Sequence, residues 1–422
     1  MSRILAIVRR ELGAAFESPV AYVTIALFVL VLDGLFFFLG FPIGPLPLPW
    51  LWEGGQATLL GLFAWLPLLF AFFVPALTMG AWADEQRSGT EELLLTYPVR
   101  TREIVLGKFL AAWSLVAIFT AAAVLPVAIT VDQLGELDWS TAWVGFAGAL
   151  LLAMAYVALG LCVSAATREP LVAYLIGALL LVLLWAARML VGVLPADLAS
   201  ALDYISPLAH FQESAARGVI ALRDPIYFGS LVLAGGCANV ILVERRRFGT
   251  AVAREVGRQL RDERWNARIF LLLLLGVVVE INVLARSHVH ARFDLSQDQL
   301  YTTSSATQRL LGRLTEPLQV KTFFSGAIQS GELALAKARV EALLGEYELL
   351  ARGAMRIDAV VPETSSEALI EAEEYGLMPY HAQSQQGLVQ VSQSVYLGVV
   401  LRYRGREQAL PFVTPATLES SF

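Results

Sequence analysis

The sequence predicts an α-helical polytopic membrane domain followed by a small α/β domain. Of the 422 residues, 57% are hydrophobic and only 16% are charged, and the mean hydropathy is +0.62. These values lie well outside the usual range of soluble globular domains. Nearly all of the long uncharged runs also precede Arg286, whereas the remainder resembles an ordinary soluble domain. We therefore expect a domain boundary near this residue.

Six apolar runs are long enough to cross a bilayer as helices, for which about 20 apolar residues are needed. They are Val20–Gly40, Ala57–Met79, Phe109–Val131, Trp143–Ala166, Leu171–Leu194 and Pro225–Val243. A seventh run, Ile269–Ala285, is shorter. The predicted organisation is a six-span domain over 1–247, a connector over 248–268, a seventh span over 269–285 and an α/β domain over 286–422.

Basic residues in the loops predict the orientation, because translocation retains Lys and Arg on the cytoplasmic side. The loops 41–56 and 132–142 contain neither residue. The segments on the other side of the membrane contain Arg9, Arg10, Arg87, Arg100, Arg102, Lys108, Arg168 and Arg245 to Arg247. Four basic residues do not follow this distribution: Arg217, Arg223, Arg286 and Arg292. The N-terminus is therefore predicted to be cytoplasmic. Seven spans would then put the C-terminal domain on the opposite side.

The segment before the first span has the pattern of an interfacial helix. Apolar residues recur at helical spacing, with charged residues between them: Ile4, Leu5, Val8, Leu12 and Phe16. The segment is either a simple lead into the first span or an elbow helix lying on the inner leaflet. Both interpretations keep it in the cytoplasm, in contact with membrane lipid.

Several classes of function are disfavoured. A net charge of −6 argues against a nucleic-acid partner. The sequence contains no phosphate-binding loop G-x-x-x-x-G-K-[ST], no H-E-x-x-H zinc motif and no G-x-S-x-G nucleophile motif. Cys162 and Cys237 lie within apolar runs, and His288 with His290 supply only two metal ligands. We therefore predict no catalytic, cofactor-binding or metal-binding residue.

Three ionisable residues fall within predicted spans: Asp33, Arg188 and Glu280. Such groups are costly in a bilayer and are often functional, which makes them candidates for a transport role. Other interpretations remain open, because Arg188 can extend to the outer headgroups and the two carboxylates can face neighbouring helices.

The segment between the second and third spans, residues 84–98, is the most informative. Gly89 is placed to end the extension of the second span, Ser88 and Glu91 have the spacing of a capping box for a short helix, and Pro98 ends that helix. The short helix exposes Leu93 to Leu95. We expect these leucine side chains to be buried, either against the chain's own helix ends or in a groove on a partner protein.

This segment resembles the coupling region of ABC-2 permeases, through the pattern E-x-x-x-G-T-x-E-x-L-L-x-x-P and the subsequent R-E-I-V-L-G-K-F. The resemblance implies that a separate ABC ATPase subunit, which binds the ATP, contacts Glu85, Gly89, Thr90, Glu92, Leu94, Leu95 and Pro98. It also implies that two six-span units pair around a substrate path. The segments 11–22 and 206–211 are most similar to the permease of gliding-motility ABC transporters.

The C-terminal region alternates strand and helix. Strands are predicted at Leu318–Phe324 and Met355–Val361, helices at Glu332–Arg352 and Ser366–Tyr375, and a hairpin within Leu388–Val413 that turns near Arg404 and Gly405. Thr364 and Glu367 have the spacing of a capping box for the second helix. The resulting βαβαββ order is typical of a thioredoxin-like fold, here without its cysteines.

Span seven and the motifs after it resemble the auxiliary component of the same gliding-associated systems, notably at 292–296, 316–317 and 323–326. The chain is therefore interpreted as a permease fused to the N-terminal part of an auxiliary subunit in the inner membrane. Two functions remain open: export of an unidentified substrate, or a mechanical relay that drives envelope or gliding machinery without solute flux.

Overall fold

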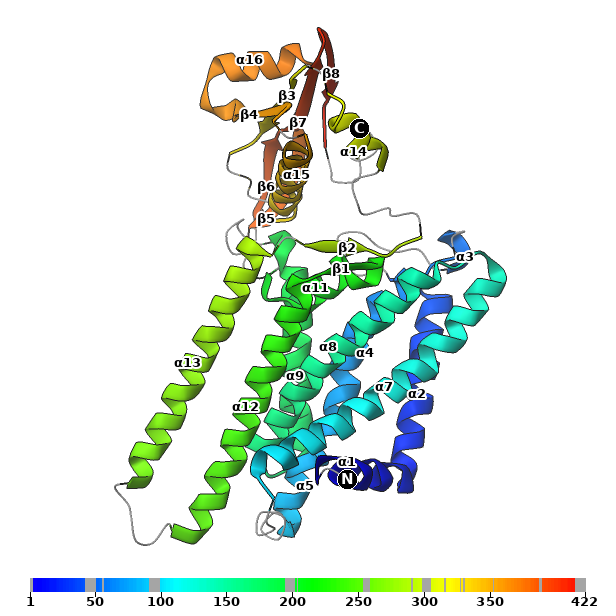
Figure 1. Cartoon of the computed structure of the whole chain (residues 1–422), viewed down its shortest axis with the longest axis vertical. Helices are drawn as coiled ribbons and strands as arrows, with labels where there is room; N and C mark the ends of the chain where they lie inside the picture. Colours follow the sequence, from blue (N-terminus) through cyan, green and yellow to red (C-terminus); the bar gives the residue numbers. More distant parts are fainter. Residues whose placement is uncertain are drawn as a thin grey trace. The chain divides into compact units, whose positions relative to one another are not determined.

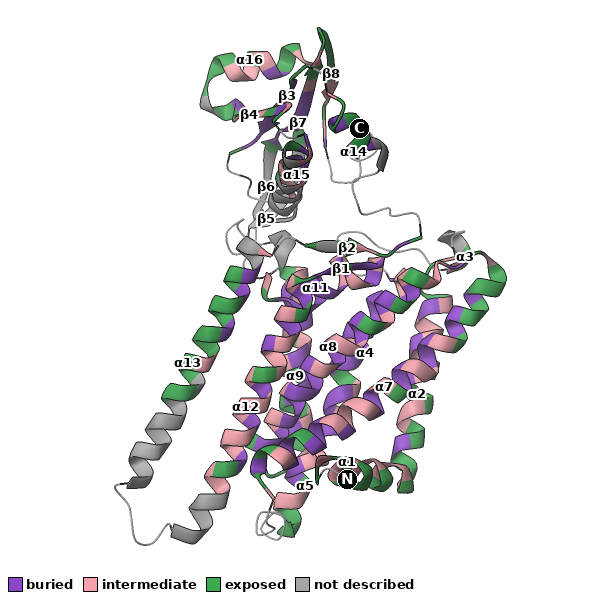
Figure 2. Ribbon diagram, viewed as in Figure 1, coloured by how far each residue is buried: buried purple, intermediate pink, exposed green. Residues whose placement is uncertain are grey.

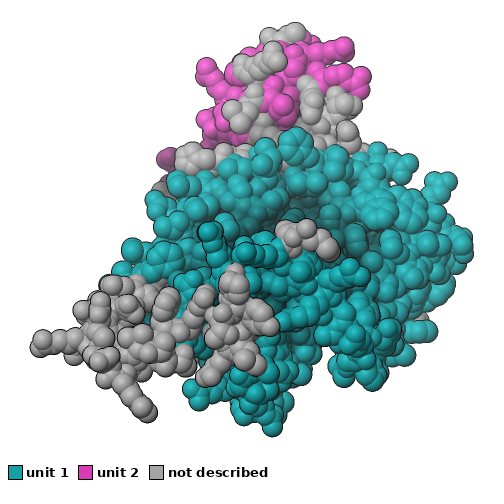
Figure 3. Space-filling model, turned by 60° about the horizontal axis from the view of Figure 1, so that its bottom comes forward, with its two compact units in different colours: residues 1–186, 207–298 teal, residues 187–206, 299–422 magenta. Residues whose placement is uncertain are grey.

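The computed structural model describes residues 3–41, 51–54, 57–90, 99–193, 202, 204–252, 259–289, 291–297, 305–314, 316–326, 328, 331–351, 353–386 and 389–413. The chain forms two compact units, which Figure 3 shows in different colours. Unit 1 comprises Met1–Ala186 and Pro207–Asp298, and unit 2 comprises Ala187–Ser206 and Gln299–Phe422.

Unit 1 is a bundle of long helices (Figure 1). Its elements are α1 (Arg3–Glu17), α2 (Pro19–Phe38), α3 (Leu51–Gly54), α4 (Leu60–Thr78), α5 (Gly80–Ser88), α7 (Thr101–Leu134), α8 (Trp139–Ala166), α9 (Pro170–Ala186), α11 (Pro207–Glu213), η2 (Ala215–Arg217), β1 (Val219–Ala221), α12 (Arg223–Val252), α13 (Gln259–His288) and β2 (Arg292–Asp294). Below, the end of the bundle that carries α1 and α5 is called the α1 end, and the end that carries β1 and β2 is called the β1 end.

Six helices in the described part of the chain are long and apolar enough to cross a membrane. They are Pro19–Phe38, Leu60–Ser88, Thr101–Leu134, Trp139–Ala166, Pro170–Leu190 and Arg223–Arg246, which confirms the six predicted helices. The apolar part of α13, Leu272–Ala285, is shorter. The 34 residues of α7 span about 51 Å at 1.5 Å per residue, well beyond a hydrocarbon core of about 30 Å.

Helix α8 lies at the centre of the bundle, where it packs against α4, α7, α9 and α12. Figure 2 shows much of α8 and α4 in the colour of buried residues. Glycines allow the close approach: a Cβ added at Gly145 would lie 2.2 Å from the Phe63 ring, and one added at Gly160 would lie 2.4 Å from Thr78 Oγ1. Small residues at such crossings are typical of membrane helix packing.

A side chain from α8 interrupts the hydrogen-bond ladder between α4 and α5. The Ser164 hydroxyl donates to the Met79 carbonyl at 2.7 Å and accepts from the backbone N–H groups of Trp82 at 3.1 Å and Ala83 at 3.4 Å. The Met79 carbonyl would otherwise pair with the N–H of Ala83, four residues on. An inserted side chain of this kind is an established cause of helix breaks.

Unit 2 contains η1 (Ala187–Val193), α14 (Ser305–Leu311), α15 (Gly331–Leu350), η3 (Pro362–Thr364) and α16 (Ser366–Glu374) with the strands β3 (Leu318–Phe324), β4 (Met355–Val360), β5 (Tyr380–Gln386), β6 (Val389–Val395), β7 (Leu397–Tyr403) and β8 (Arg406–Leu410). Four strands form a sheet of order β4-β3-β7-β8, in which β3 is parallel to β4 and antiparallel to β7. The strands β5 and β6 form a separate hairpin.

The strands β3 and β4 and the helices α15 and α16 lie close to the predicted ranges, and the β7–β8 turn falls at Arg404 and Gly405 as expected. The helix α14 and the strand β5, which forms a hairpin with β6, were not predicted. The cap of α16 was predicted wrongly. Ser365, rather than Thr364, has the extended N-cap backbone, and its hydroxyl accepts from the N–H of Ala368 at 3.1 Å. Thr364 belongs instead to the preceding turn η3, because Pro362 starts that turn two residues earlier.

Candidate functional site

A cluster of charged residues lies at the α1 end of the bundle. The ammonium group of Lys108, on α7, is only 3% exposed, and its Nζ lies 2.8 Å from Glu85 Oε1 on α5 and 3.3 Å from Glu11 Oε1 on α1. Arg10 also pairs with both carboxylates, at 3.7 Å from Glu85. These four residues are called the Lys108 cluster. They join three helices that are distant in sequence.

The cluster satisfies its buried cation fully. Besides the two carboxylates, Lys108 Nζ donates to the Ala81 carbonyl at 2.8 Å, so each of its three N–H groups has an acceptor. It also lies 5.1 Å from the centre of the Trp82 ring, within cation–π range. Because two carboxylates balance two cations, the charge of the cluster sums to zero. A buried charge is tolerated only when it is paired in this way.

The charges of the cluster also control the ionisation of Glu11. Burial alone raises the pKa of this carboxyl, but the positive charge of Lys108 and the hydrogen bond from Arg10 outweigh burial and hold the pKa below its usual value. Glu11 therefore remains a carboxylate at neutral pH and holds α1 electrostatically on the bundle.

Packing reinforces these ion pairs between α1 and α7. The side chain of Ile7 lies directly over Gly107, where an added Cβ would come within 2.6 Å of Ile7 Cγ2. Arg3 Nη1 lies 3.9 Å from Glu103, whose carboxylate accepts from the backbone N–H of Arg100 at 3.0 Å and caps the start of α7. Helix α1 is thus fixed along the first turns of α7, in addition to leading into α2.

The predicted coupling residues begin next to this cluster. Glu85 is a member of the cluster, and Gly89 ends α5 in the left-handed conformation at φ 72°, as expected. Thr90 is exposed, and its hydroxyl lies 2.9 Å from Ser88 Oγ. The remaining predicted contact residues lie outside the described residues: Glu92, Leu94, Leu95 and Pro98.

The three predicted intramembrane charges lie on different elements: Asp33 on α2, Arg188 on η1 and Glu280 on α13. Asp33 Oδ1 is buried and has no hydrogen-bond partner within the described part of the chain. Glu280 is exposed on α13. The described residues contain no group of three or more His, Cys, Asp or Glu side chains that could hold a metal ion.

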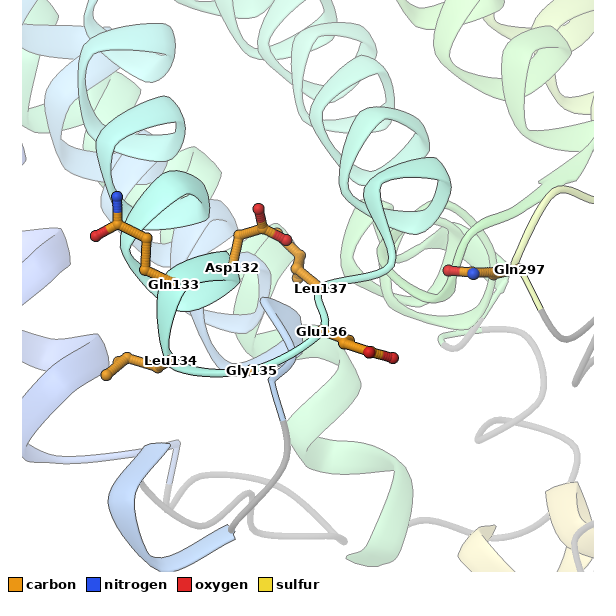
Figure 4. A pocket seen from close by; sticks show the side chains of 7 residues that line it. All are labelled: Asp132, Gln133, Leu134, Gly135, Glu136, Leu137 and Gln297. Atoms are coloured by element: carbon orange, nitrogen blue, oxygen red, sulfur yellow. The ribbon is translucent and has the colours of Figure 1, made fainter.

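The β1 end offers a shallow hollow and a buried contact between a histidine and an aspartate. Asp132 to Leu137, from the end of α7 and the turn after it, line the hollow together with Gln297 (Figure 4). At the start of α12, Asp224 Oδ1 lies 2.7 Å from His210 Nδ1, and the His210 ring stacks on Tyr227 at 4.0 Å. His210 and Asp224 are both buried, so the pair fastens α11 to α12.

Comparison with known protein families identifies the membrane unit. A family described as ABC-2 family transporter protein matches residues 5–224, which is more than half of the chain. The chain belongs to the ABC-2 transporter family. It is therefore a multi-pass membrane protein and the membrane subunit of a transporter, and permeases of this family work in general with an ABC ATPase. A domain of unknown function, DUF7088, matches residues 297–402. Comparison with curated proteins found no match.

Sequence reasoning overlooked the central residue of this ABC-2 permease's cluster. Lys108 was interpreted as one of the basic residues that mark the cytoplasmic side and as part of the motif R-E-I-V-L-G-K-F, without a role in an ion-pair cluster. A detectable signal was present: Lys108 is a single charge in an apolar stretch, between Ile104 to Leu106 and Phe109 to Leu110. Glu11 and Ser164 gave no such signal, because their roles depend on helices that meet only in the fold.

Proposed function

We propose that this chain is the permease subunit of an ABC exporter whose separate ATPase docks on residues 85–98. The supporting observation is the Lys108 cluster, because Glu85 is the first residue of that segment and Lys108 follows its last residue on α7. A partner that pushes on the segment therefore acts on two spans at once. The chain itself is not an enzyme in this proposal and carries no cofactor, because ATP is bound and hydrolysed by the partner.

Contacts on the other side of α5 extend the path of movement. Ser164 fastens the α4–α5 break to α8, and Arg87 Nη1 on α5 lies 3.6 Å from Glu169, just before α9. With the Lys108 cluster, α5 is thus joined to α1, α7, α8 and the start of α9. A displacement of α5 by the ATPase would be transmitted to all of these helices without a further hinge.

The location of the protein is part of the same proposal. The α1 end faces the cytoplasm, α13 is a seventh span, and the domain after residue 286 lies on the outer side of the inner membrane. Helix α1 rests on the inner leaflet, because its face away from α7 carries a shallow apolar groove lined by Leu5, Val8, Leu12 and Phe16. A second copy of the chain completes the substrate path.

The motif resemblance supports a finer assignment, to the gliding-motility group of ABC-2 permeases fused to the start of its auxiliary component. The connector 248–268 then joins two proteins that are separate elsewhere. Apart from the separate β5–β6 hairpin, the elements β3, α15, β4, α16, β7 and β8 follow a βαβαββ order, and with the sheet order β4-β3-β7-β8 they support a thioredoxin-like fold for the auxiliary part. A redox role is not implied, because both cysteines of the chain precede residue 286.

A mechanical relay without solute flux is the second candidate. The observation that favours it is the pairing of β1 with β2, which attaches the segment just before unit 2 to the permease bundle. Movement of the bundle would then reach the C-terminal domain directly.

Co-purification with the ATPase tests docking at the predicted segment. Leu94→Asp and Glu92→Lys should abolish recovery of the ATPase with the permease and leave membrane insertion intact, because both changes alter the proposed contact. Glu136→Lys, an equivalent charge reversal at an exposed site of the β1 end, is the matched control and should retain the ATPase. Unchanged recovery with both docking variants would contradict the proposal.

Reconstitution separates the two candidate functions. Substrate-stimulated ATP hydrolysis together with flux in vesicles supports export. A nucleotide-driven change of shape without flux supports the relay.

A further inference from the structure

Residues 225–296 lie between the two family matches, and part of this stretch completes the β1 end of the permease. Strand β2, which comes after α13, pairs antiparallel with β1, which precedes α12. The register places Ile220 opposite Phe293, Val219 opposite Asp294 and Ala221 opposite Arg292. The chain thus leaves this end through α12 and returns to it through α13.

Backbone hydrogen bonds extend the ladder on both sides. The N–H of Leu222 donates to the Ala291 carbonyl at 3.1 Å, and the N–H of Leu295 donates to the Gly218 carbonyl at 3.0 Å. In antiparallel pairing, hydrogen-bonded and non-hydrogen-bonded pairs alternate, so Ile220 and Phe293 also form a hydrogen-bonded pair.

The same segment is tied to the N-terminus of α8. Asp138 caps α8 by accepting from the N–H of Thr141 at 3.1 Å, and its other oxygen accepts from the N–H of Gln297 at 2.9 Å. That second oxygen also accepts from the Thr141 hydroxyl at 2.6 Å. Thr141 in turn lies against Gly218, where an added Cβ would come within 2.5 Å of Thr141 Oγ1. These contacts join α8, the η2–β1 turn and residues 291–297.

A polar contact fastens α13 to α12 below the ladder. Asn282 Nδ2 donates to Ser230 Oγ at 2.8 Å, and both side chains are 6% exposed. Val278, Asn282 and Ala285 are buried residues of α13, and their spacing places them on one helix face. Most of the other described residues of α13 are exposed (Figure 2).

We propose that residues 291–297 form an outer clasp that stays closed while the rest of the permease moves. The clasp holds the β1-end parts of α8, α12 and α13 together as one block within unit 1. Hydrogen bonds from residues 291–297 to β1, Gly218 and Asp138 distinguish this segment from a plain linker after a membrane helix. Movement of the block by ATP hydrolysis rests on the proposed function. The existence of the clasp does not depend on it.

A disulfide across the ladder tests the clasp in the full-length chain. Ile220→Cys with Phe293→Cys is introduced after Cys162 and Cys237 are replaced by alanine, and a protease site is inserted within residues 253–258. The Cα atoms of a hydrogen-bonded antiparallel pair lie about 5.5 Å apart, which suits a disulfide. After mild oxidation in membranes and proteolysis, we expect the two fragments to migrate together on a non-reducing gel and to separate after reduction.

The matched control is Ile220→Cys with Leu295→Cys, in which both side chains are again exposed. This pair is out of register by two residues, and diagonal neighbours lie about 7–8 Å apart, beyond the reach of a disulfide. At least fivefold more cross-link in the Ile220/Phe293 pair supports the clasp. Equal yields in the two pairs, or no cross-link in either, would overturn it.

The effect of the cross-link on ATP hydrolysis tests whether the clasp stays closed. In the complex with its co-purifying ATPase, we expect the oxidised and reduced proteins to hydrolyse ATP at rates within about twofold of each other. A fivefold or greater inhibition that reductant reverses would show that the clasp must open, and would overturn the proposal. If no ATPase associates with the uncross-linked chain, the proposed function fails and the yields of the two cysteine pairs alone decide on the clasp.

Discussion

Glu85 on α5 and Lys108 on α7 form an ion pair of 2.8 Å that joins the end of the second long apolar helix to the start of the third. The two residues are 23 positions apart, and the predicted docking segment lies between them. Because the pair joins α5 to α7, the helices before and after the segment are held together. The ion pair is therefore the structural basis of the proposed path from the ATPase to the membrane helices.

Removal of the Lys108 charge should destabilise the α1 end strongly. Lys108→Met leaves two largely buried carboxylates facing each other, and breaking a buried pair costs about 3–5 kcal/mol. Chemical unfolding monitored by tryptophan fluorescence measures the loss. The double variant Lys108→Met/Glu85→Gln should recover part of it, because one uncompensated charge is also removed. Equal stability of the wild-type protein and the Lys108→Met variant would rule out a structural role for the cluster.

A methyl group at Gly107 should displace α1 from α7. The added Cβ would lie 2.6 Å from Ile7 Cγ2, closer than real Cβ contacts allow, so Gly107→Ala should lower the melting temperature by several degrees. Ile7→Ala in the same chain should restore part of the loss by making room. Gly236→Ala is the matched control on α12, since nothing lies within 4 Å of a Cβ there. The interpretation fails if the two glycine variants melt alike.

The spans could be predicted from the sequence because hydropathy reports directly on the requirement for about 20 apolar residues. The junction of α4 and α5 could not. It depends on Ser164, a residue 85 positions after Met79, whose hydroxyl reaches the helix only when α8 packs beside it. The charge cluster has the same origin, since Glu11 and Lys108 are 97 positions apart. Local patterns contain no information about such pairs.

Strand β2 was also not predicted. The motif 292–296 was interpreted through resemblance alone, because three residues give no periodic signal that distinguishes a strand from a loop. Its pairing with β1 depends on the antiparallel return of α13 beside α12. By contrast, Gly89 was correctly expected to end a helix, since a left-handed residue after a helix is a local property that glycine favours.

Loss of the Ser164 hydroxyl should loosen the contact between α8 and α5. Ser164→Ala leaves the Met79 carbonyl and the N–H groups of Trp82 and Ala83 without this partner in a buried place, at a cost of about 1–3 kcal/mol. Ser114→Ala is the control, because the Ser114 hydroxyl bonds only within its own helix, to the Leu110 carbonyl. Its effect should stay below about 0.5 kcal/mol. If the two variants have the same unfolding midpoint, the proposed role of Ser164 is contradicted.

Acid should weaken the β1 end through Asp138. Burial raises the pKa of this carboxyl, but hydrogen bonds from Thr141, Gln297 and Ser140 outweigh burial and hold the pKa below its ordinary value. A lowered native pKa means that the stabilisation is complete above the usual aspartate value of about 3.9 and is lost as the pH falls below it. Unfolding measured between pH 6 and pH 3 should show this loss, and Asp138→Asn should reduce it. An identical pH dependence in the two proteins would exclude Asp138 as its source.

The most direct test of the central claim is the side of the membrane on which Thr90 lies. Thr90→Cys is exposed just beyond α5, and Glu136→Cys serves as the reference at the β1 end, with Cys162 and Cys237 replaced by alanine. A membrane-impermeant thiol reagent should label Glu136→Cys in cells whose outer envelope has been permeabilised. It should label Thr90→Cys only in inverted membrane vesicles. Labelling of Thr90→Cys from the outside would contradict the account, because an ATPase in the cytoplasm could not reach the segment.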